Sequence, residues 1–160
     1  MGFVSNIPIG QVAYASMGTN TTDAIQLWVT DIFIPTAMSF SIVGFLQGGT
    51  ATTDNTLVAV YDPGGNLITT SNLAGVVLSG GNTFQEQTLL KPVYVSGPTY
   101  LFIAIQGSST TAGALQTIPT GVYVGIRAGS VTAGVFGTVP NTITVPQTFT
   151  TNKGPIVYVR

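Results

Sequence analysis

The sequence predicts an all-β protein, an antiparallel β-sandwich built from about nine short strands. Thr, Val, Ile and aromatic residues dominate, and no long apolar stripe recurs with the 3.6-residue period of a helix. Gly or Pro interrupts the chain almost every ten residues, a spacing typical of sandwiches. The jelly roll is the version of this fold that best fits the expected number of strands. An up-and-down barrel would give the same pattern and remains the competing architecture.

The expected strands follow one another along the chain, separated by small, neutral loops such as QGGTATTDN and LSGGNT. In order they are Gln11–Ser16, Ile25–Ile34, Ala37–Leu46, Thr56–Asp62, Leu67–Ser71, Thr83–Leu90, Tyr100–Gln106, Gly121–Arg127 and Pro155–Arg160.

The strand from Ala37 to Leu46 shows the alternation of a half-buried antiparallel strand. Met38, Phe40 and Ile42 share one face, and two serines between them share the other. We therefore expect these three apolar side chains to face the core.

The next long strands differ in how many of their faces are apolar. In TFQEQTLL, the core face is expected to carry Phe84 and Leu90, with Gln85 and Gln87 turned to water. LFIAIQ is apolar on both faces, which predicts that residues 101–105 form a central strand.

The stretch LVAVYDPGGNLITTS reads as two strands joined by a turn. Pro63 pre-sets φ for a turn, Gly64 and Gly65 supply positive φ, and Asn66 tolerates it. Asp62 at the head of the turn would accept hydrogen bonds from backbone N–H groups further on. We interpret Asp62 as a turn residue, the alternative being a calcium or ligand site.

The composition sets the charge of the surface. Charged residues make up 6% of the 160 residues, against about 25% in an ordinary soluble domain. The chain contains 25 Thr, 10 Ser and 20 Gly, so the expected surface is neutral and rich in hydroxyl groups. A net charge of −1 gives little electrostatic repulsion between copies and favours association. The length suits one domain, residues 1–160, with an N-terminal arm and first strand in residues 1–24.

Several classes of partner are not expected from this composition. Four cations, Lys91, Arg127, Lys153 and Arg160, are too few for a nucleic-acid-binding patch. No apolar run approaches the length of a membrane span, and the N-terminal residues do not resemble a signal peptide. We therefore expect neither a nucleic acid nor a membrane as partner.

Residues for catalysis are almost absent from the sequence. The chain has no His and no Cys, which excludes a Ser–His–Asp triad, a Cys nucleophile and an imidazole metal site. No two acidic residues lie closer than eight positions, so no local calcium loop exists. No phosphate-binding glycine motif is present. The sequence predicts a protein that is not an enzyme and has no cofactor and no metal.

Two residue types stand out as candidates for interaction. Trp28 is the only tryptophan, and it is either an anchor in a core or interface or a platform on which a sugar stacks. Lys153 and Arg160 place half of the positive charge in the last eight residues. They are either a solvated terminus or ion-pair partners of an acidic protein.

The segment 138–160 is expected to be extended. It contains TVPNTI followed by TVPQTF, in which the prolines exclude a central strand, and it ends in PIVYVR. The proline-spaced part is either a connection along the sandwich or an arm that reaches a neighbouring subunit. The last strand either completes its own sandwich or adds to a neighbour's sheet edge, with Ile156 and Tyr158 on one face and Val157 and Val159 on the other.

The succession TLVAVYDPGGNLITTSNLAGVV, NTFQEQTLLKPVYVSGPTYLFIAIQG, VFGTVP and GPIVYVR resembles β-sandwich domains of tailed-bacteriophage virions. These occur in capsid decoration (cement) proteins and in head or tail fibres, and the matching stretches cover about two thirds of this chain. The resemblance implies a non-enzymatic structural protein, commonly a trimer, on the surface of an icosahedral shell or in a fibre. It supplies no functional residue for any position of this chain.

We therefore expect a capsid decoration protein that binds the major capsid protein of the phage head and stabilises the assembled shell. It would be a homotrimer on the virion surface, made in the cytoplasm of the bacterial host. The alternatives are a fibre or receptor-binding domain and a lectin-like carbohydrate-binding module, with an enzyme a distant third. The candidate interaction residues are Trp28, Lys153, Ile156, Tyr158 and Arg160.

Overall fold

The described part of the chain is β throughout, as the sequence predicts. The computed structural model describes residues 3–7, 18–21, 24–49, 54–77, 81–108, 114–118 and 125–160. Its strands are β1 (Val4–Ser5), β2 (Gly18–Thr21), β3 (Gln26–Ile34), β4 (Met38–Leu46), β5 (Asn55–Tyr61), β6 (Leu67–Thr70), β7 (Val76–Val77), β8 (Phe84–Val95), β9 (Thr99–Gly107), β10 (Ala114–Thr117), β11 (Ala128–Thr132) and β12 (Val157–Val159).

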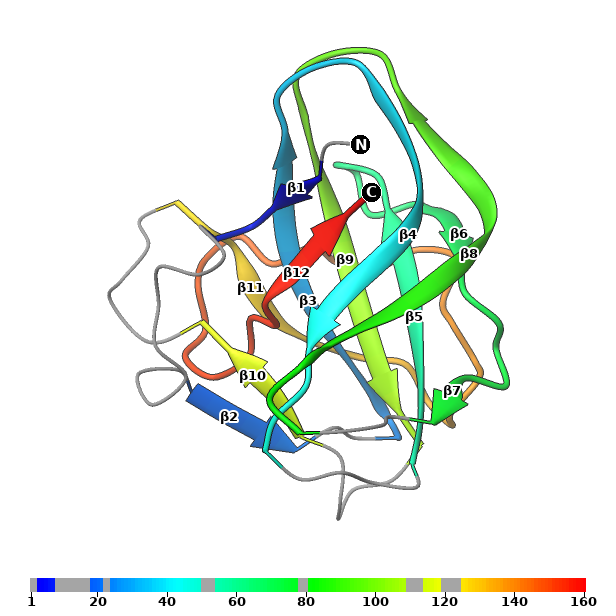
Figure 1. Cartoon of the computed structure of the whole chain (residues 1–160), viewed down its shortest axis with the longest axis vertical. Helices are drawn as coiled ribbons and strands as arrows, with labels where there is room; N and C mark the ends of the chain where they lie inside the picture. Colours follow the sequence, from blue (N-terminus) through cyan, green and yellow to red (C-terminus); the bar gives the residue numbers. More distant parts are fainter. Residues whose placement is uncertain are drawn as a thin grey trace.

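Two antiparallel sheets pack against each other as a β-sandwich (Figure 1). The four-stranded sheet has the order β1-β12-β4-β8 and lies in front in Figure 1. The six-stranded sheet has the order β11-β3-β9-β5-β6, with β7 paired to β5. A small ribbon of β10 and β2 lies at one end and connects to the four-stranded sheet through the bridge between Gln47 and Leu115.

The main core lies between the two sheets and comes from residues of seven strands. It consists of Trp28, Ile32 and Ile34 of β3, Phe40, Val43 and Phe45 of β4, Val58 and Val60 of β5, Leu89 and Val93 of β8, Leu101, Ile103 and Ile105 of β9, Val157 and Val159 of β12, and Leu115 of β10.

Strand β9 is central, as its sequence predicts. It lies between β3 and β5 in the six-stranded sheet. Its odd-numbered side chains enter the main core, and Phe102 and Ala104 on the other face are fully buried as well. The outer face of this sheet is therefore covered by another part of the chain.

That cover is the segment 133–150, which we call the C-terminal strap. It passes behind the six-stranded sheet in Figure 1, from the side of β6 to the side of β11. At the β6 side, the Leu67 amide donates to the Asn141 carbonyl at 2.8 Å. At the β11 side, Ala128 donates to the Thr148 carbonyl and accepts from the Thr150 amide. The strap therefore lies along its own sandwich, the first of the two alternatives that the sequence leaves open.

The strap closes a second core. Its Val139, Ile143 and Val145 pack against a cluster that includes Tyr61 and Phe102 on the outer face of the sheet. The Tyr61 hydroxyl also donates to the carbonyl of Pro140 at 3.0 Å. Burial of this phenol raises the pKa of Tyr61 well above its usual value.

The side chains of β4 that face the core differ in part from the prediction. Met38 and Phe40 face the core as expected, but a register shift in the pairing with β8 separates Phe40 from Ile42. After this bulge Val43 takes the core position and Ile42 is only half-buried. A single irregularity shifts the alternation by one residue, which sequence periodicity does not reveal.

In β8 the predicted core face is wrong. Leu90 is 66% exposed, whereas Leu89 and Gln87 are buried. The reason is that Gln87 pairs with the core residue Val43, so Gln87 and Leu89 share the core face of β8 and Leu90 lies on its outer face. Leu89 also forms a bridge with Ser71 beside the other sheet. The amide of Gln87 points between the sheets, where its Nε2 donates to the Thr56 carbonyl.

Some strand boundaries also differ. Of the strand expected at Gly121–Arg127, residues 125–127 are not in a strand, and residues 121–124 lie outside the described part. The strand β11 runs from Ala128 to Thr132. The expected strand Gln11–Ser16 and most of the 1–24 segment also lie outside the described part. The short strands β2, β7 and β10 were not predicted, because a strand of two to four residues is too short to show a periodic pattern of apolar residues.

The strap contacts the backbone of the sandwich closely at Gly65. Its φ is +85°, and a Cβ placed there would lie 2.2 Å from the Ile143 carbonyl oxygen. The amide of Ile143 in turn donates to the Gly65 carbonyl at 2.9 Å. A side chain at this position would therefore both strain the backbone and displace the strap.

We predict that Gly65→Ala lowers the free energy of unfolding by at least about 2 kcal/mol more than Gly134→Ala. Gly134 also has positive φ, +92°, but a Cβ there meets nothing within 4 Å. The control should therefore cost only the backbone strain, about 1 kcal/mol. Urea unfolding of both variants measures the difference, and equal losses would contradict the proposed contact between the strap and Gly65.

Candidate functional site

The predicted C-terminal interaction residues lie within the chain's own sandwich. Strand β12 pairs with β4 on one side and with β1 on the other. Val157 and Val159 enter the main core, while Ile156 is 1% exposed and packs in a smaller cluster with Ile7, Leu46 and Ile118. The last strand thus completes its own sheet in this structure.

Trp28 and Lys153 contact each other. Trp28 is 3% exposed in the main core, and the Lys153 Nζ lies 3.7 Å from the centroid of its ring. Such a contact stabilises an ammonium over the π face of an indole. Trp28 is therefore a core anchor rather than an exposed platform, and the charge of Lys153 is directed at its own chain.

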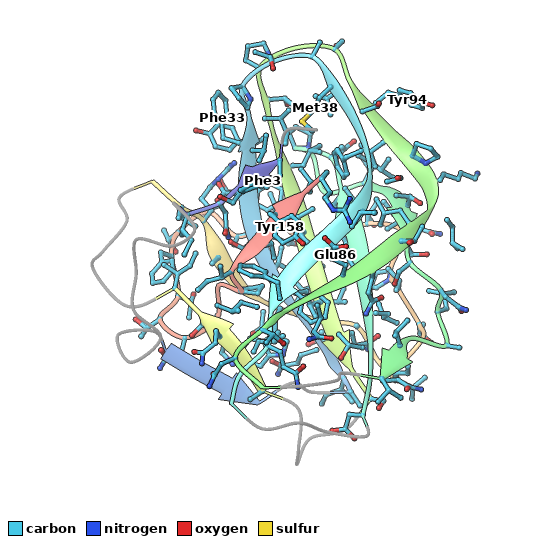
Figure 2. The ribbon with its side chains drawn as sticks, in the orientation of Figure 1. Phe3, Phe33, Met38, Glu86, Tyr94 and Tyr158 are labelled. Carbon is cyan, nitrogen blue, oxygen red and sulfur yellow. The ribbon has the colours of Figure 1, made fainter. Side chains whose placement is uncertain are left out.

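Arg160 and Tyr158 both bind the carboxylate of Glu86 on β8. Tyr158 and Glu86 lie close together in Figure 2. The guanidinium is bidentate, with Nε at 2.8 Å from Oε1 and Nη2 at 2.6 Å from Oε2. The Tyr158 hydroxyl donates to Oε1. The hydrogen bond from Arg160 is the main reason why the pKa of Glu86 falls to about 2. Burial, followed by the hydrogen bond that Tyr158 donates to Glu86, raises the pKa of Tyr158 to about 12.

The ring of Tyr158 lies between Phe3 and Phe84 and covers Gly44. The ring centroids are 5.7 Å and 5.1 Å from Tyr158, in edge-to-face arrangements. A Cβ at Gly44 would lie 2.2 Å from the Tyr158 ring, so glycine lets the ring lie on the strand. The sequence gives no signal for this cluster, since its members are Phe3, which precedes β1, and residues of β4, β8 and β12.

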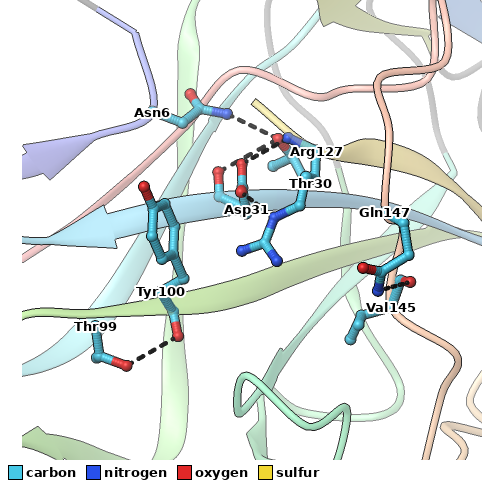
Figure 3. A network of polar contacts seen from close by, with 8 residues as sticks. All are labelled: Asn6, Thr30, Asp31, Thr99, Tyr100, Arg127, Val145 and Gln147. Atoms are coloured by element: carbon cyan, nitrogen blue, oxygen red, sulfur yellow. Dashed lines mark hydrogen bonds and ion pairs between the residues drawn. The ribbon is translucent and has the colours of Figure 1, made fainter. Parts of the chain in front are cut away.

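A partly buried ion pair lies on the outer face of the six-stranded sheet (Figure 3). Asp31 of β3 is 2% exposed, and its Oδ2 lies 2.8 Å from the Arg127 Nε. Its Oδ1 accepts the Arg127 backbone amide at 3.0 Å. The guanidinium also covers the rings of Tyr100 and Phe102, at 4.9 Å and 4.7 Å from their centroids. Two segments 96 residues apart in the sequence are joined in this way, which no local motif predicts.

Beside this pair lies a small pocket with an aromatic wall. Phe33 and Tyr100 are cross-strand neighbours on β3 and β9, and their ring centroids are 4.9 Å apart. They are 45% and 43% exposed. The pocket has a volume of about 190 Å³ and is lined by Ser5, Asn6, Asp31, Phe33, Tyr100, Gly125 and Ile126.

A second surface follows β6 and β8, and we define the β8 face as Ile68, Leu90 and Tyr94. Their exposed fractions are 40%, 66% and 79%. Tyr94 points away from the sandwich in Figure 2. Ile68 and Tyr94 line one open groove of about 340 Å³, together with Pro63, Val93, Val95, Ser96, Gly97, Pro98, Thr99 and Leu101.

Asp62 is a turn residue, as predicted. Its Oδ1 accepts the backbone amides of Gly64 and Asn66, each at 2.8 Å, and its Oδ2 accepts the Asn66 side-chain amide at 2.9 Å. These hydrogen bonds, that of the Asn66 side chain first, lower the pKa of Asp62. Both carboxylate oxygens of Asp62 thus accept hydrogen bonds from residues of the same turn, 62–66.

The titratable groups do not form a reactive cluster in the part of the chain that the structure describes. Among those residues no three His, Cys, Asp or Glu side chains are grouped so that they could hold a metal ion. The same residues include no helix long and apolar enough to span a membrane. The geometry instead offers two surfaces for binding, the aromatic pocket and the β8 face.

Comparisons of the chain with protein-family models, curated proteins and solved structures gave no match. The resemblance to virion β-sandwich proteins accordingly rests on the sequence stretches that carry it. What it implies about function is taken up below as a proposal.

The pair between Glu86 and Arg160 should make stability depend on pH. Because the pKa of Glu86 is lowered from 4.5 to about 2, its contribution is complete above about pH 4.5 and is lost as the pH falls toward 2. We predict that Glu86→Gln melts at a lower temperature than the wild type at pH 7. The melting temperatures of the wild type and of Glu86→Gln should converge as the pH falls from 4.5 to 2. A difference in melting temperature that stays constant over this range would contradict the assignment.

Proposed function

We propose that the protein is a non-enzymatic structural protein of a bacteriophage virion, a capsid decoration (cement) protein. It binds the major capsid protein on the surface of the assembled head and stabilises the shell. It is a homotrimer, made in the cytoplasm of the host bacterium, and its sandwich is of the jelly-roll type. In support of that topology, the chain passes repeatedly from one sheet to the other, at β3–β4, β4–β5, β7–β8 and β8–β9.

The observation that carries the proposal is that the chain has few charges and pairs most of its cations with its own side chains. Of the four cations, Arg127 binds Asp31, Arg160 binds Glu86 and Lys153 covers Trp28. An exterior with so little charge can be covered over a broad area without stripping water from ions, which is the expensive step in burying charged surface. A protein packed in many copies against a shell needs such an exterior.

The β8 face is the surface that we assign to the shell. Leu90 and Tyr94 expose most of their apolar area, and Pro92 lies between them in the same strand. Aromatic and apolar residues are typical of the centre of protein interfaces, where charged residues are depleted. Lys91 is the cation on this stretch, and it would lie at the rim of the contact.

A second function, a fibre or receptor-binding domain or a lectin-like module, is favoured by a different observation. Phe33 and Tyr100 expose their rings beside a pocket with polar lining. The two functions use different surfaces, so they can be tested separately.

The test is co-sedimentation with particles assembled from the major capsid protein encoded in the same genome. We predict that the wild-type protein sediments with the particles and raises their melting temperature. Leu90→Lys and Tyr94→Lys should each weaken binding by about tenfold or more, since a lysine would be desolvated in the interface. Val135→Lys is the matched control, because Val135 is 70% exposed outside the β8 face.

Failure of the wild-type protein to sediment with the particles would contradict the proposed function. Equal binding by all three variants would contradict the assignment of the β8 face. Light scattering of the free protein checks the trimer, and a mass near the 16.5 kDa of one chain would contradict that part of the proposal.

A further inference from the structure

We infer that the pocket formed by Phe33, Tyr100 and Asp31 binds one neutral pyranose ring of a glycan. This binding site is independent of the proposed contact with a capsid, because it lies on the outer face of the six-stranded sheet. In Figure 2, Phe33 and Tyr94 of the β8 face lie at opposite sides of the sandwich.

The wall of the pocket is an aromatic platform. Phe33 and Tyr100 stand directly opposite each other on adjacent antiparallel strands, with rings tilted by 45°. Both keep nearly half of their surface in contact with water although the neighbouring residues of the same face, Val29 and Phe102, are fully buried. The C–H face of a pyranose is apolar and flat, and it stacks on such rings while its hydroxyl groups stay free for hydrogen bonds.

The platform is held in place before any ligand binds. The Arg127 guanidinium covers Tyr100, and the buried carboxylate of Asp31 fixes this guanidinium through Nε and the backbone amide. Asp31 itself lies in a strand that is hydrogen-bonded on both sides. A sugar therefore meets a preorganised surface, and little side-chain freedom is lost on binding.

The polar lining selects hydroxyl groups. A carboxylate has about four acceptor positions, and Arg127 uses two of those on Asp31, one on each oxygen. Ser5 and Asn6 add polar atoms at the edge of the same pocket. Asp31 is the charged residue in this lining, and the Arg127 guanidinium already neutralises its carboxylate, so the described lining offers no unpaired cation to an acidic sugar. The charge thus favours a neutral ligand.

The size of the pocket fits one ring. Its volume of about 190 Å³ corresponds to roughly six water molecules at ~30 Å³ each. Pockets for drug-sized ligands begin at about 300 Å³. A single pyranose, with the rest of the glycan in solvent, is the occupant that matches both the volume and the open aromatic wall.

Ligand-observed saturation-transfer NMR tests the inference on the full chain. The probes are glucose, galactose, mannose and N-acetylglucosamine, with glucuronate as the acidic comparison. We expect at least one neutral sugar to bind with a roughly millimolar dissociation constant and glucuronate to bind more weakly. Phe33→Leu and Tyr100→Leu retain apolar bulk but lose the aromatic face, and each should raise the dissociation constant about tenfold or more.

Tyr94→Leu is the matched control, since Tyr94 is the more exposed aromatic side chain but lies on the β8 face. It should leave sugar binding unchanged. Circular dichroism and melting curves verify that each variant is folded, and the two platform variants are independent of each other. The inference is overturned if no neutral sugar binds up to about 50 mM, if glucuronate binds at least as well, or if folded Phe33→Leu and Tyr100→Leu bind like the control.

Discussion

The constraint on which this structure depends is that the six-stranded sheet must be covered on both faces. Strands β3, β5 and β9 carry apolar side chains on both faces of the sheet, so neither face is stable in contact with water. The four-stranded sheet covers one face. In the absence of helices in the described part, the C-terminal strap covers the other, with its prolines holding it extended. Gly65 sets how closely it can approach.

The same arrangement explains where the few charges lie. Each ion pair joins segments that are distant in the sequence, Asp31 with Arg127 and Glu86 with Arg160. Paired charges at these positions fix how β3 meets the start of β11 and how β8 meets β12. Because these charges pair with each other within the chain, the exterior carries little unpaired charge, and the proposed functions depend on such an exterior. The binding surfaces are accordingly aromatic and apolar rather than ionic.

Local chemistry made part of this structure predictable from the sequence. The run LFIAIQ identified the central strand because it is apolar on both faces, and DPGGN identified the turn around Asp62 because the deciding hydrogen bonds lie within the segment. The predicted burial of Leu90 was wrong because the pairing of Gln87 with the core residue Val43, which is distant in the sequence, decides which face of β8 meets the core. The pocket at Phe33 and Tyr100 depends on a pairing register 67 residues apart, and the partners of Arg160 and Lys153 likewise appear only in three dimensions.

Native-state hydrogen exchange tests most directly whether the strap is an integral layer of the fold. The amides to compare are those of Ile143 and Thr150, which bind the Gly65 and Ala128 carbonyls, and that of Ile103 in the central strand. If the strap is required to bury the outer face, these amides open together, with protection factors within about tenfold of one another. Rapid exchange at Ile143 and Thr150 beside a still-protected Ile103 would contradict the account, because the sheet would then stand without its cover.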